Sequence, residues 1–210
     1  NFDVKRGELV TLLGRNGAGR STTLKAIMNM VGRRTGSIVI NGNETLRMKP
    51  HHIPRLGIGY CPEERGIFAS LDVHENLLLP PTVRSGGMSL DEIYAMFPNL
   101  YERRRSQGTR LSGGEQQMLA MARILRTGAR LLLLDEITEG LAPVIVQKLG
   151  EVLVQLKERG MTIVLVEQNF RFAAPLADRH FVMDHGQIVE EITAAQLPSR
   201  REHLNSMLGV

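Results

Sequence analysis

The sequence predicts an α/β fold in which helices cover both faces of a mostly parallel sheet. Three continuous apolar stretches indicate this, at residues 9–13, 131–134 and 161–166. Strands that are apolar along their whole length are typical of sheets buried on both sides. Helical patterns alternate with these stretches, which indicates parallel strands joined by crossover helices. The 210 residues are enough for a sizeable core, and we expect one domain over residues 1–210.

The remaining elements are expected from turn residues and helical patterns. In chain order they are a helix at 21–30, strands at 37–40 and 58–61, a helical subdomain at about 72–126, a helix at 144–159, a hairpin at 181–189 and a helical tail from 194. Asn41-Gly42 supplies a hairpin turn, and Gly160 ends a helix as a C-terminal glycine does. The subdomain is expected to be an insertion in the α/β core.

Composition narrows the classes of function. The 26 basic and 22 acidic residues are interspersed, so the net charge of +4 does not indicate a nucleic-acid surface. The sequence has no Trp and three Tyr, which argues against stacking of single strands. No apolar run approaches the roughly 20 residues that span a bilayer. Cys61, the one cysteine, has no internal partner, which favours a reducing compartment.

A glycine-rich loop follows the first apolar strand and leads into a helix. Its residues are Gly14, Arg15, Asn16, Gly17, Ala18, Gly19, Arg20, Ser21 and Thr22. The spacing fits the phosphate-binding pattern G-x-x-x-x-G-K-[ST], with Arg20 at the lysine position. Glycines let backbone N–H groups converge on phosphate oxygens, and the helix start adds positive potential. The loop therefore predicts a nucleotide site, with the Ser21 hydroxyl on Mg²⁺.

Arg20 bears on the chemistry of that site. It keeps the positive charge that attracts phosphate. Arginine is a longer planar fork, however, whereas lysine is a compact point charge, so the two are not interchangeable. We expect nucleotide binding to be retained but weakened, and hydrolysis to be impaired.

A second helix start and an acidic strand end complete the pattern. The helix start consists of Leu111, Ser112, Gly113, Gly114 and Glu115. Ser112 is a good N-cap, and the glycines leave N–H groups accessible to phosphate. After the strand at 131–134, Asp135 fits a water-mediated Mg²⁺ partner and Glu136 fits a base for the attacking water. Taken singly, these features also fit a capped helix and surface acids.

In this order the three motifs resemble those of ABC ATPases, over residues 7 to about 190. The resemblance implies a P-loop NTPase core and a head-to-tail dimer. ATP with Mg²⁺ would lie between the phosphate loop of one subunit and the signature, residues 111–115, of the other. It also implies an identical or different ATPase partner and transmembrane permease subunits. The place of work would be the cytoplasmic face of the inner membrane, as a peripheral subunit.

Finer features are most similar to the subunits of bacterial branched-chain amino acid importers. Glu63 stands at the Q-loop position, where many ABC proteins have glutamine. Ala142 replaces the usual D-loop aspartate, and Gln168 replaces the usual switch histidine. Gln168 can donate to a γ-phosphate without becoming charged, so it joins Glu136 as a catalytic candidate. Such an importer implies a periplasmic binding protein as an indirect partner.

Two residues depart from the family pattern. Arg20 is one, and Ile137 is the other, because a proline normally follows the acidic pair. Without the proline ring φ is free and an N–H is restored, so Glu136 is expected to be held more loosely. The chain is also expected to lack the family's N-terminal strand region and its adenine-stacking aromatic residue.

Other interpretations remain open. Arg20 and Ile137 favour a hydrolysis-impaired, nucleotide-gated subunit of a heterodimeric transporter. ABC ATPases of DNA repair or translation typically carry a long coiled coil or a second ABC domain, and this sequence shows neither. A GTPase would need a guanine-reading Asn/Lys-x-x-Asp loop, which nothing here resembles. The histidines lack metal-ligand spacing, so a zinc site is not expected.

Overall fold

The computed structural model describes residues 1–209 and is built around a six-stranded sheet. The strands are β1 Leu9–Leu13, β4 Ile58–Cys61, β5 Leu131–Asp135, β6 Thr162–Val166, β7 Arg179–Asp184 and β8 Gln187–Thr193. Their spatial order is β4-β5-β6-β1-β7-β8. Neighbours from β4 to β7 are parallel, and β8 pairs antiparallel with β7. The predicted mostly parallel sheet with a terminal hairpin is confirmed.

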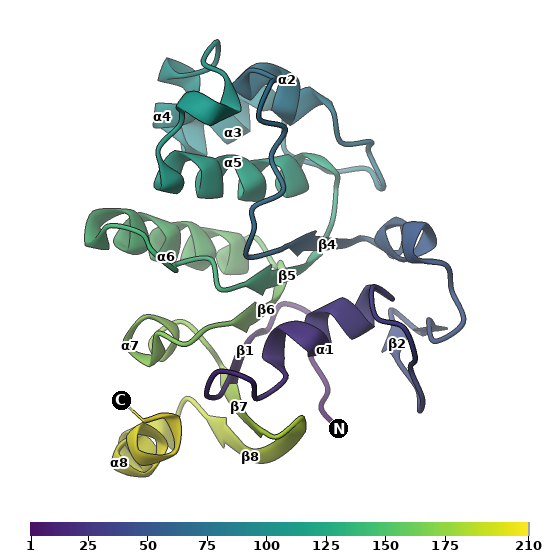
Figure 1. The fold of residues 1–210 in the computed structure, drawn as a ribbon, viewed down its shortest axis with the longest axis vertical. Coiled ribbons are helices and arrows are strands. Elements are labelled where there is room, and N and C mark those ends of the chain that lie inside the picture. The colour runs from purple at the N-terminus through teal and green to yellow at the C-terminus, as the bar shows by residue number, and fades with distance from the viewer. Residues whose placement is uncertain (210) are drawn as a thin grey trace.

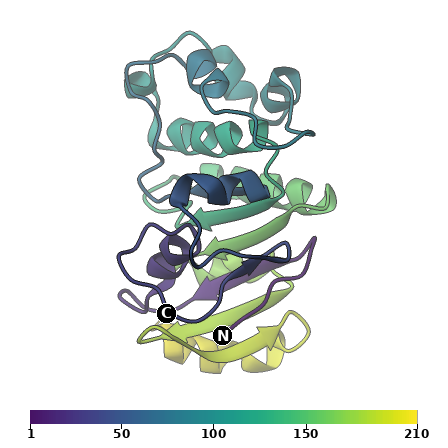
Figure 2. The same ribbon diagram turned by 90° about the vertical axis from the view of Figure 1, so that its right-hand side faces the viewer.

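Helices cover both faces of this sheet (Figure 1 and Figure 2). The core helices are α1 Arg20–Ile27, the 3₁₀ helix η1 Pro50–Leu56, α6 Pro143–Glu158, α7 Phe170–Ala173 and α8 Leu197–Leu208. Alternate residues of one strand serve opposite faces. Val10 and Leu12 pack with Leu24 of α1, whereas Leu9 and Leu13 join the cluster that includes α6. Burial on both faces explains why these strands are apolar throughout.

A group of helices lies at one end of the molecule, beyond β4 (Figure 1). They are α2 Val73–Leu78, α3 Leu90–Met96, α4 Pro98–Glu102, the 3₁₀ helix η2 Gly108–Arg110 and α5 Gly113–Arg126. Capping boxes start α2 at Asp72 and α3 at Ser89, so each helix satisfies two of its own free N–H groups. All five elements lie within the range 72–126 that the sequence predicts as helical.

Some local features differ from the sequence-based expectation. Helix α1 ends at Ile27 and not at residue 30, because Asn29 adopts a left-handed conformation with φ 55°. The expected strand at 37–40 is shorter: Val39–Ile40 (β2) pairs with Asn43–Glu44 (β3) around the Asn41-Gly42 turn. Helix η1 was absent from the expectation. Among residues 1–209, no helix is long and apolar enough to cross a membrane.

Candidate functional site

The glycine-rich loop joins β1 to α1 and lies against the β7–β8 hairpin. Gly19 is the N-cap of α1 and has φ 98°, a conformation that side chains disfavour. A Cβ on Gly19 would lie 3.2 Å from the Cα of Gly186. A Cβ on Gly14 would lie only 2.5 Å from the carbonyl oxygen of Met183. Glycine at both positions therefore lets the loop pack closely on the hairpin.

The start of α1 leaves backbone donors available. The first N–H groups of a helix have no intrahelical acceptor and need another partner. In the described chain, no side chain caps α1, and its first turn carries no acidic residue. The first residue of the helix is instead the basic Arg20. Free donors and a positive charge make this helix start suited to an anion.

A cavity of about 330 Å³ opens above the loop. It is lined by Arg15, Asn16, Gly17, Ala18, Gly19, Arg20, Ser21, Thr22, Glu63, Glu136, Glu139 and Gln168. Of the residues predicted to bind nucleotide, only Gly14 is absent from this lining. The predicted Q-loop residue, Glu63, and both predicted catalytic residues, Glu136 and Gln168, also line the cavity. Residues from four distant parts of the sequence thus meet at one edge of the sheet.

Glu136 is held by a hydrogen bond to each of its two oxygens. Arg20 Nη2 donates to Oε1 at 2.6 Å, and Gln168 Nε2 donates to Oε2 at 2.8 Å. The Arg20 side chain is 4% exposed and that of Glu136 is 9% exposed. Ile137, next in the chain, is fully buried in the core cluster. A loosely held Glu136 is therefore not borne out, because two donors and a buried neighbour fix it.

The other terminal nitrogen of Arg20 lacks a partner. Nη1 is buried and has no hydrogen bond to any residue that the structure describes. Buried polar atoms without partners are costly, and guanidinium groups bind phosphate oxygens strongly. Arg20 lines the cavity beside the free N–H groups of α1. This donor set fits the phosphates of a nucleotide.

Oxygen ligands for a magnesium ion lie beside the loop. Ser21 Oγ donates to Asp135 Oδ1 at 2.8 Å, and Tyr60 Oη donates to Oδ2 at 3.1 Å. Burial raises the pKa of Asp135, while the bonds from Ser21 and Tyr60 act in the opposite direction. Burial, followed by the charge of Asp135, raises the pKa of Tyr60. The Ser21–Asp135 pair fits Mg²⁺, and Tyr60 is a partner that the sequence reasoning missed.

Three of the residues that line the cavity are carboxylates that lie close together. One oxygen from each of Glu63, Glu136 and Glu139 lies within 4.8 Å of the others. A hydrogen bond with Glu136, followed by burial, raises the pKa of Glu139. Carboxylates this close repel each other unless they share a proton or a cation. The sequence reasoning also missed Glu139; an acid three residues after Glu136 was the available signal.

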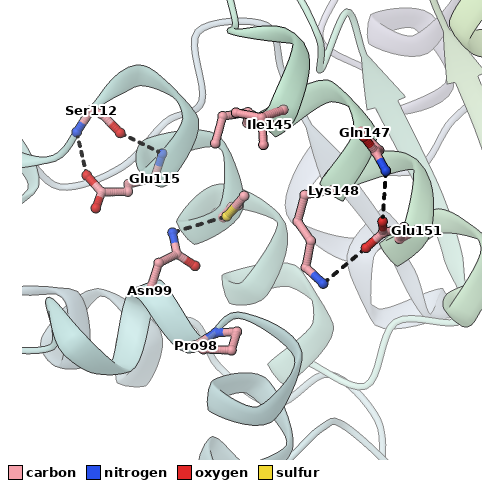
Figure 3. A pocket seen from close by; sticks show the side chains of 10 residues that line it. Pro98, Asn99, Ser112, Glu115, Ile145, Gln147, Lys148 and Glu151 are labelled. Carbon is pink, nitrogen blue, oxygen red and sulfur yellow. Dashed lines mark hydrogen bonds and ion pairs between the residues drawn. The ribbon is translucent and has the colours of Figure 1, made fainter.

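The predicted signature lies elsewhere in the molecule, at the start of α5. Ser112 caps this helix: its Oγ accepts from Glu115 N at 3.3 Å, and Glu115 Oε2 accepts from Ser112 N at 2.7 Å. Both residues line a groove of about 490 Å³ between α4, α5 and α6 (Figure 3). Neither residue lines the cavity at the phosphate loop. Ile145, Lys148 and Glu151 form the α6 side of the groove. One chain therefore keeps its two helix starts apart.

Comparison with known proteins identifies the family. A family model described as ABC transporter matches residues 1–139. The chain is 40% identical to the high-affinity branched-chain amino acid transport ATP-binding protein BraG of Pseudomonas aeruginosa, over 100% of this chain and 91% of BraG. The chain belongs to the ABC transporter family. The predicted resemblance to the branched-chain type is confirmed.

A second relative belongs to a different transport system. The cassette is 31% identical to the lipopolysaccharide export system ATP-binding protein LptB of Haemophilus influenzae, over 100% of this chain and 89% of LptB. Both relatives are ATP-binding proteins, but one serves branched-chain amino acid transport and the other lipopolysaccharide export. The comparisons therefore establish an ABC ATP-binding subunit and leave its cargo open.

The fold of the cassette agrees with this family. It superimposes with a TM-score of 0.82 on the ATP-binding cassette MJ0796, solved as a dimer in a post-hydrolysis state with ADP and Pi. The match covers 92% of this chain and 88% of MJ0796, at 26% identity. The predicted P-loop NTPase core is thereby confirmed. The roles of individual site residues remain predictions.

Proposed function

We propose that this cassette binds and hydrolyses ATP to power an ABC importer for branched-chain amino acids. One observation carries the hydrolytic part: the phosphate loop, Glu136 and Gln168 line a single cavity. The cargo is supported by the 40% identity to BraG, against 31% to LptB. Residues 1–210 would act as one ABC ATPase domain, with the subdomain at 72–126 inserted in the core.

The residues of the cavity would divide the chemistry. Bound Mg²⁺ would supply positive charge to the triphosphate, held through Ser21 and Asp135. The N–H groups at the start of α1 and the guanidinium of Arg20 would bind phosphate oxygens. Glu136 would orient or deprotonate the attacking water, and Gln168 would donate to the terminal phosphate. Arg20, Ser21, Glu136 and Gln168 line the cavity, and Asp135 adjoins it through its hydrogen bond with Ser21.

The site would be completed by a second subunit. The signature residues 111–115 lie outside this chain's own cavity, so we expect them to serve the nucleotide of an identical or different partner. The pair would act at the cytoplasmic face of the inner membrane, beneath permease subunits. A periplasmic binding protein would deliver the cargo.

A second candidate is a hydrolysis-impaired, nucleotide-gated subunit of a heterodimer. The buried ion pair between Arg20 and Glu136 favours it. Arg20 and Gln168 each donate to one oxygen of Glu136, so two of its acceptor positions are already taken before a water binds.

Reconstitution separates these candidates. The cassette, with permeases encoded beside it, would be placed in vesicles and supplied with radiolabelled leucine, ATP and Mg²⁺. ATP-dependent leucine uptake with phosphate release supports the importer. Binding of a fluorescent ATP analogue without phosphate release supports the gated subunit. Absence of nucleotide binding overturns both.

A further inference from the structure

Glu167 is a buried carboxylate next to Gln168, which lines the cavity. It follows β6 and precedes Gln168, and it is 2% exposed. Its oxygen Oε1 accepts from the backbone N–H of Thr138 at 3.1 Å. Its oxygen Oε2 accepts from the Thr138 hydroxyl at 2.9 Å. Both oxygens of the Glu167 carboxylate therefore accept hydrogen bonds from the same residue, Thr138.

The surroundings of Glu167 are unusual for an acid. In the described part of the chain, it forms no ion pair with a basic side chain. Burial raises the pKa of Glu167 to about 7, although the bonds from Thr138 and from the backbone of Asn169 oppose this. An apolar side chain at this place would avoid the cost of burying the carboxylate. The gain from the carboxylate is the fixed connection to Thr138.

Both ends of this connection adjoin the catalytic candidates. In the segment of Glu167, the next residue is Gln168, which donates to Glu136. In the segment of Thr138, Glu136 lies two residues earlier, and its φ of 48° is left-handed and costly for a residue with a side chain. The two segments are also joined where Glu136 N donates to Val166 O at 2.9 Å. The two hydrogen bonds from Thr138 to Glu167 therefore hold the strained turn that carries Glu136.

The segment after Thr138 reaches the signature helix. Leu141 N donates to Thr138 O at 3.3 Å, which closes a turn. A Cβ added to Gly113 would lie 3.5 Å from Leu141 Cδ2, so Leu141 packs beside the first residue of α5. A continuous set of contacts thus runs from Glu136 through Thr138 to the signature.

We propose that Glu167 is a positioning residue that couples Glu136 and Gln168 to the segment 138–141 and, through it, to the signature. This inference rests on the proposed ATP-dependent function. It assigns Glu167 no contact with nucleotide, since Glu167 does not line the cavity. Its effect is transmitted through Thr138.

Three variants test this coupling. Glu167→Leu removes both acceptors at similar volume. Glu167→Gln keeps one oxygen for the Thr138 N–H, and its NH₂ group can donate to the Thr138 hydroxyl, so it is the conservative rescue. Thr138→Val removes only the hydroxyl and serves if Glu167→Leu does not fold. Thermal unfolding checks each variant.

The first readout is hydrogen–deuterium exchange with and without Mg²⁺ and an ATP analogue that has nitrogen between the β- and γ-phosphates. In the wild type we expect the analogue to slow exchange in residues 14–22 and to change it in 111–115. Glu167→Leu is expected to retain the first response and lose the second, and Glu167→Gln to retain both. An unchanged signature response in Glu167→Leu overturns the coupling. Absence of any response at 14–22 in the wild type overturns the proposed function, and the coupling with it.

The second readout is steady-state hydrolysis. Because small misplacements of catalytic groups are costly, we expect Glu167→Leu to lower kcat about 10- to 100-fold with KM little changed. Glu167→Gln should restore kcat. A purely structural role would instead lower the unfolding temperature and leave kcat per folded molecule unchanged, which contradicts the proposal.

Discussion

The two helix starts of this cassette solve the same problem in different ways. At α5, Ser112 and Glu115 cap the helix, because the side chain of each accepts from the other's backbone N–H group. At α1 no side chain of the described chain caps the helix, and Arg20 retains an unpartnered buried nitrogen. Donors that no side chain caps are open to water or to an anionic ligand. The difference indicates that the start of α1, and not that of α5, is arranged to bind an anion next to side chains of its own chain.

The largest effect is expected from removing the charge of Glu136, which accepts from Arg20 at the start of α1. We expect Glu136→Gln to lower kcat by about 10²–10⁴-fold, the usual contribution of a general base. Nucleotide affinity should be retained, because a glutamine still accepts from Arg20. Phosphate release and analogue binding are measured in parallel. The matched control is Glu158→Gln, at the exposed end of α6; an equal loss in that variant contradicts a specific role for Glu136.

Glu167, which we propose couples the two helix starts, should make the stability of the fold depend on pH. The pKa of Glu167 is raised from 4.5 to about 7 in the folded chain, so the folded state binds the proton more tightly than the unfolded state. The free energy of unfolding should therefore fall as pH rises from about 4.5 to 7, by up to about 3 kcal/mol relative to Glu167→Gln. Urea unfolding of both proteins at pH 5 and pH 7.5 measures this. Parallel pH profiles would show that Glu167 does not titrate in this way.

Replacing the planar guanidinium of Arg20 by the compact ammonium group of lysine tests whether Arg20 limits hydrolysis at the start of α1. Arg20→Lys replaces the guanidinium that donates to Glu136. A hydrogen bond to a charged group is worth about 1.5–3 kcal/mol, so we expect hydrolysis to rise about 10- to 100-fold. Phosphate release is compared with that of Arg15→Lys, which changes another arginine of the same loop. Equal rates for wild type and Arg20→Lys would refute the impairment.

The smallest effect is expected at the capped start of α5. Ser112→Ala removes the acceptor for Glu115 N and should lower the free energy of unfolding by about 1 kcal/mol. Ser199→Ala, in the first turn of α8, serves as a serine control. Chemical denaturation measures both variants. A loss of several kcal/mol would mean that Ser112 supports more than its own helix end.

The sequence predicted what depends on local pattern. The apolar runs located the buried strands, and Ser112 was predicted as the N-cap of α5. It could not show that Arg20 meets Glu136, because the two are 116 residues apart and their contact depends on rotamers at a shared sheet edge. The bond from Tyr60 to Asp135 was hidden for the same reason. Expecting Glu136 to be loose failed because a missing proline removes one constraint while distant side chains supply others.

The charges around the cavity have a consequence for how nucleotide enters. The lining carries two guanidinium groups, from Arg15 and Arg20, against three carboxylates, from Glu63, Glu136 and Glu139. A bare triphosphate brings several further negative charges into a partly desolvated space, where repulsion is strong. A divalent cation, or protons on the acids, that enters together with the nucleotide would offset this repulsion. ATP stripped of metal should be a poor ligand for this cassette even though its phosphate loop is preformed.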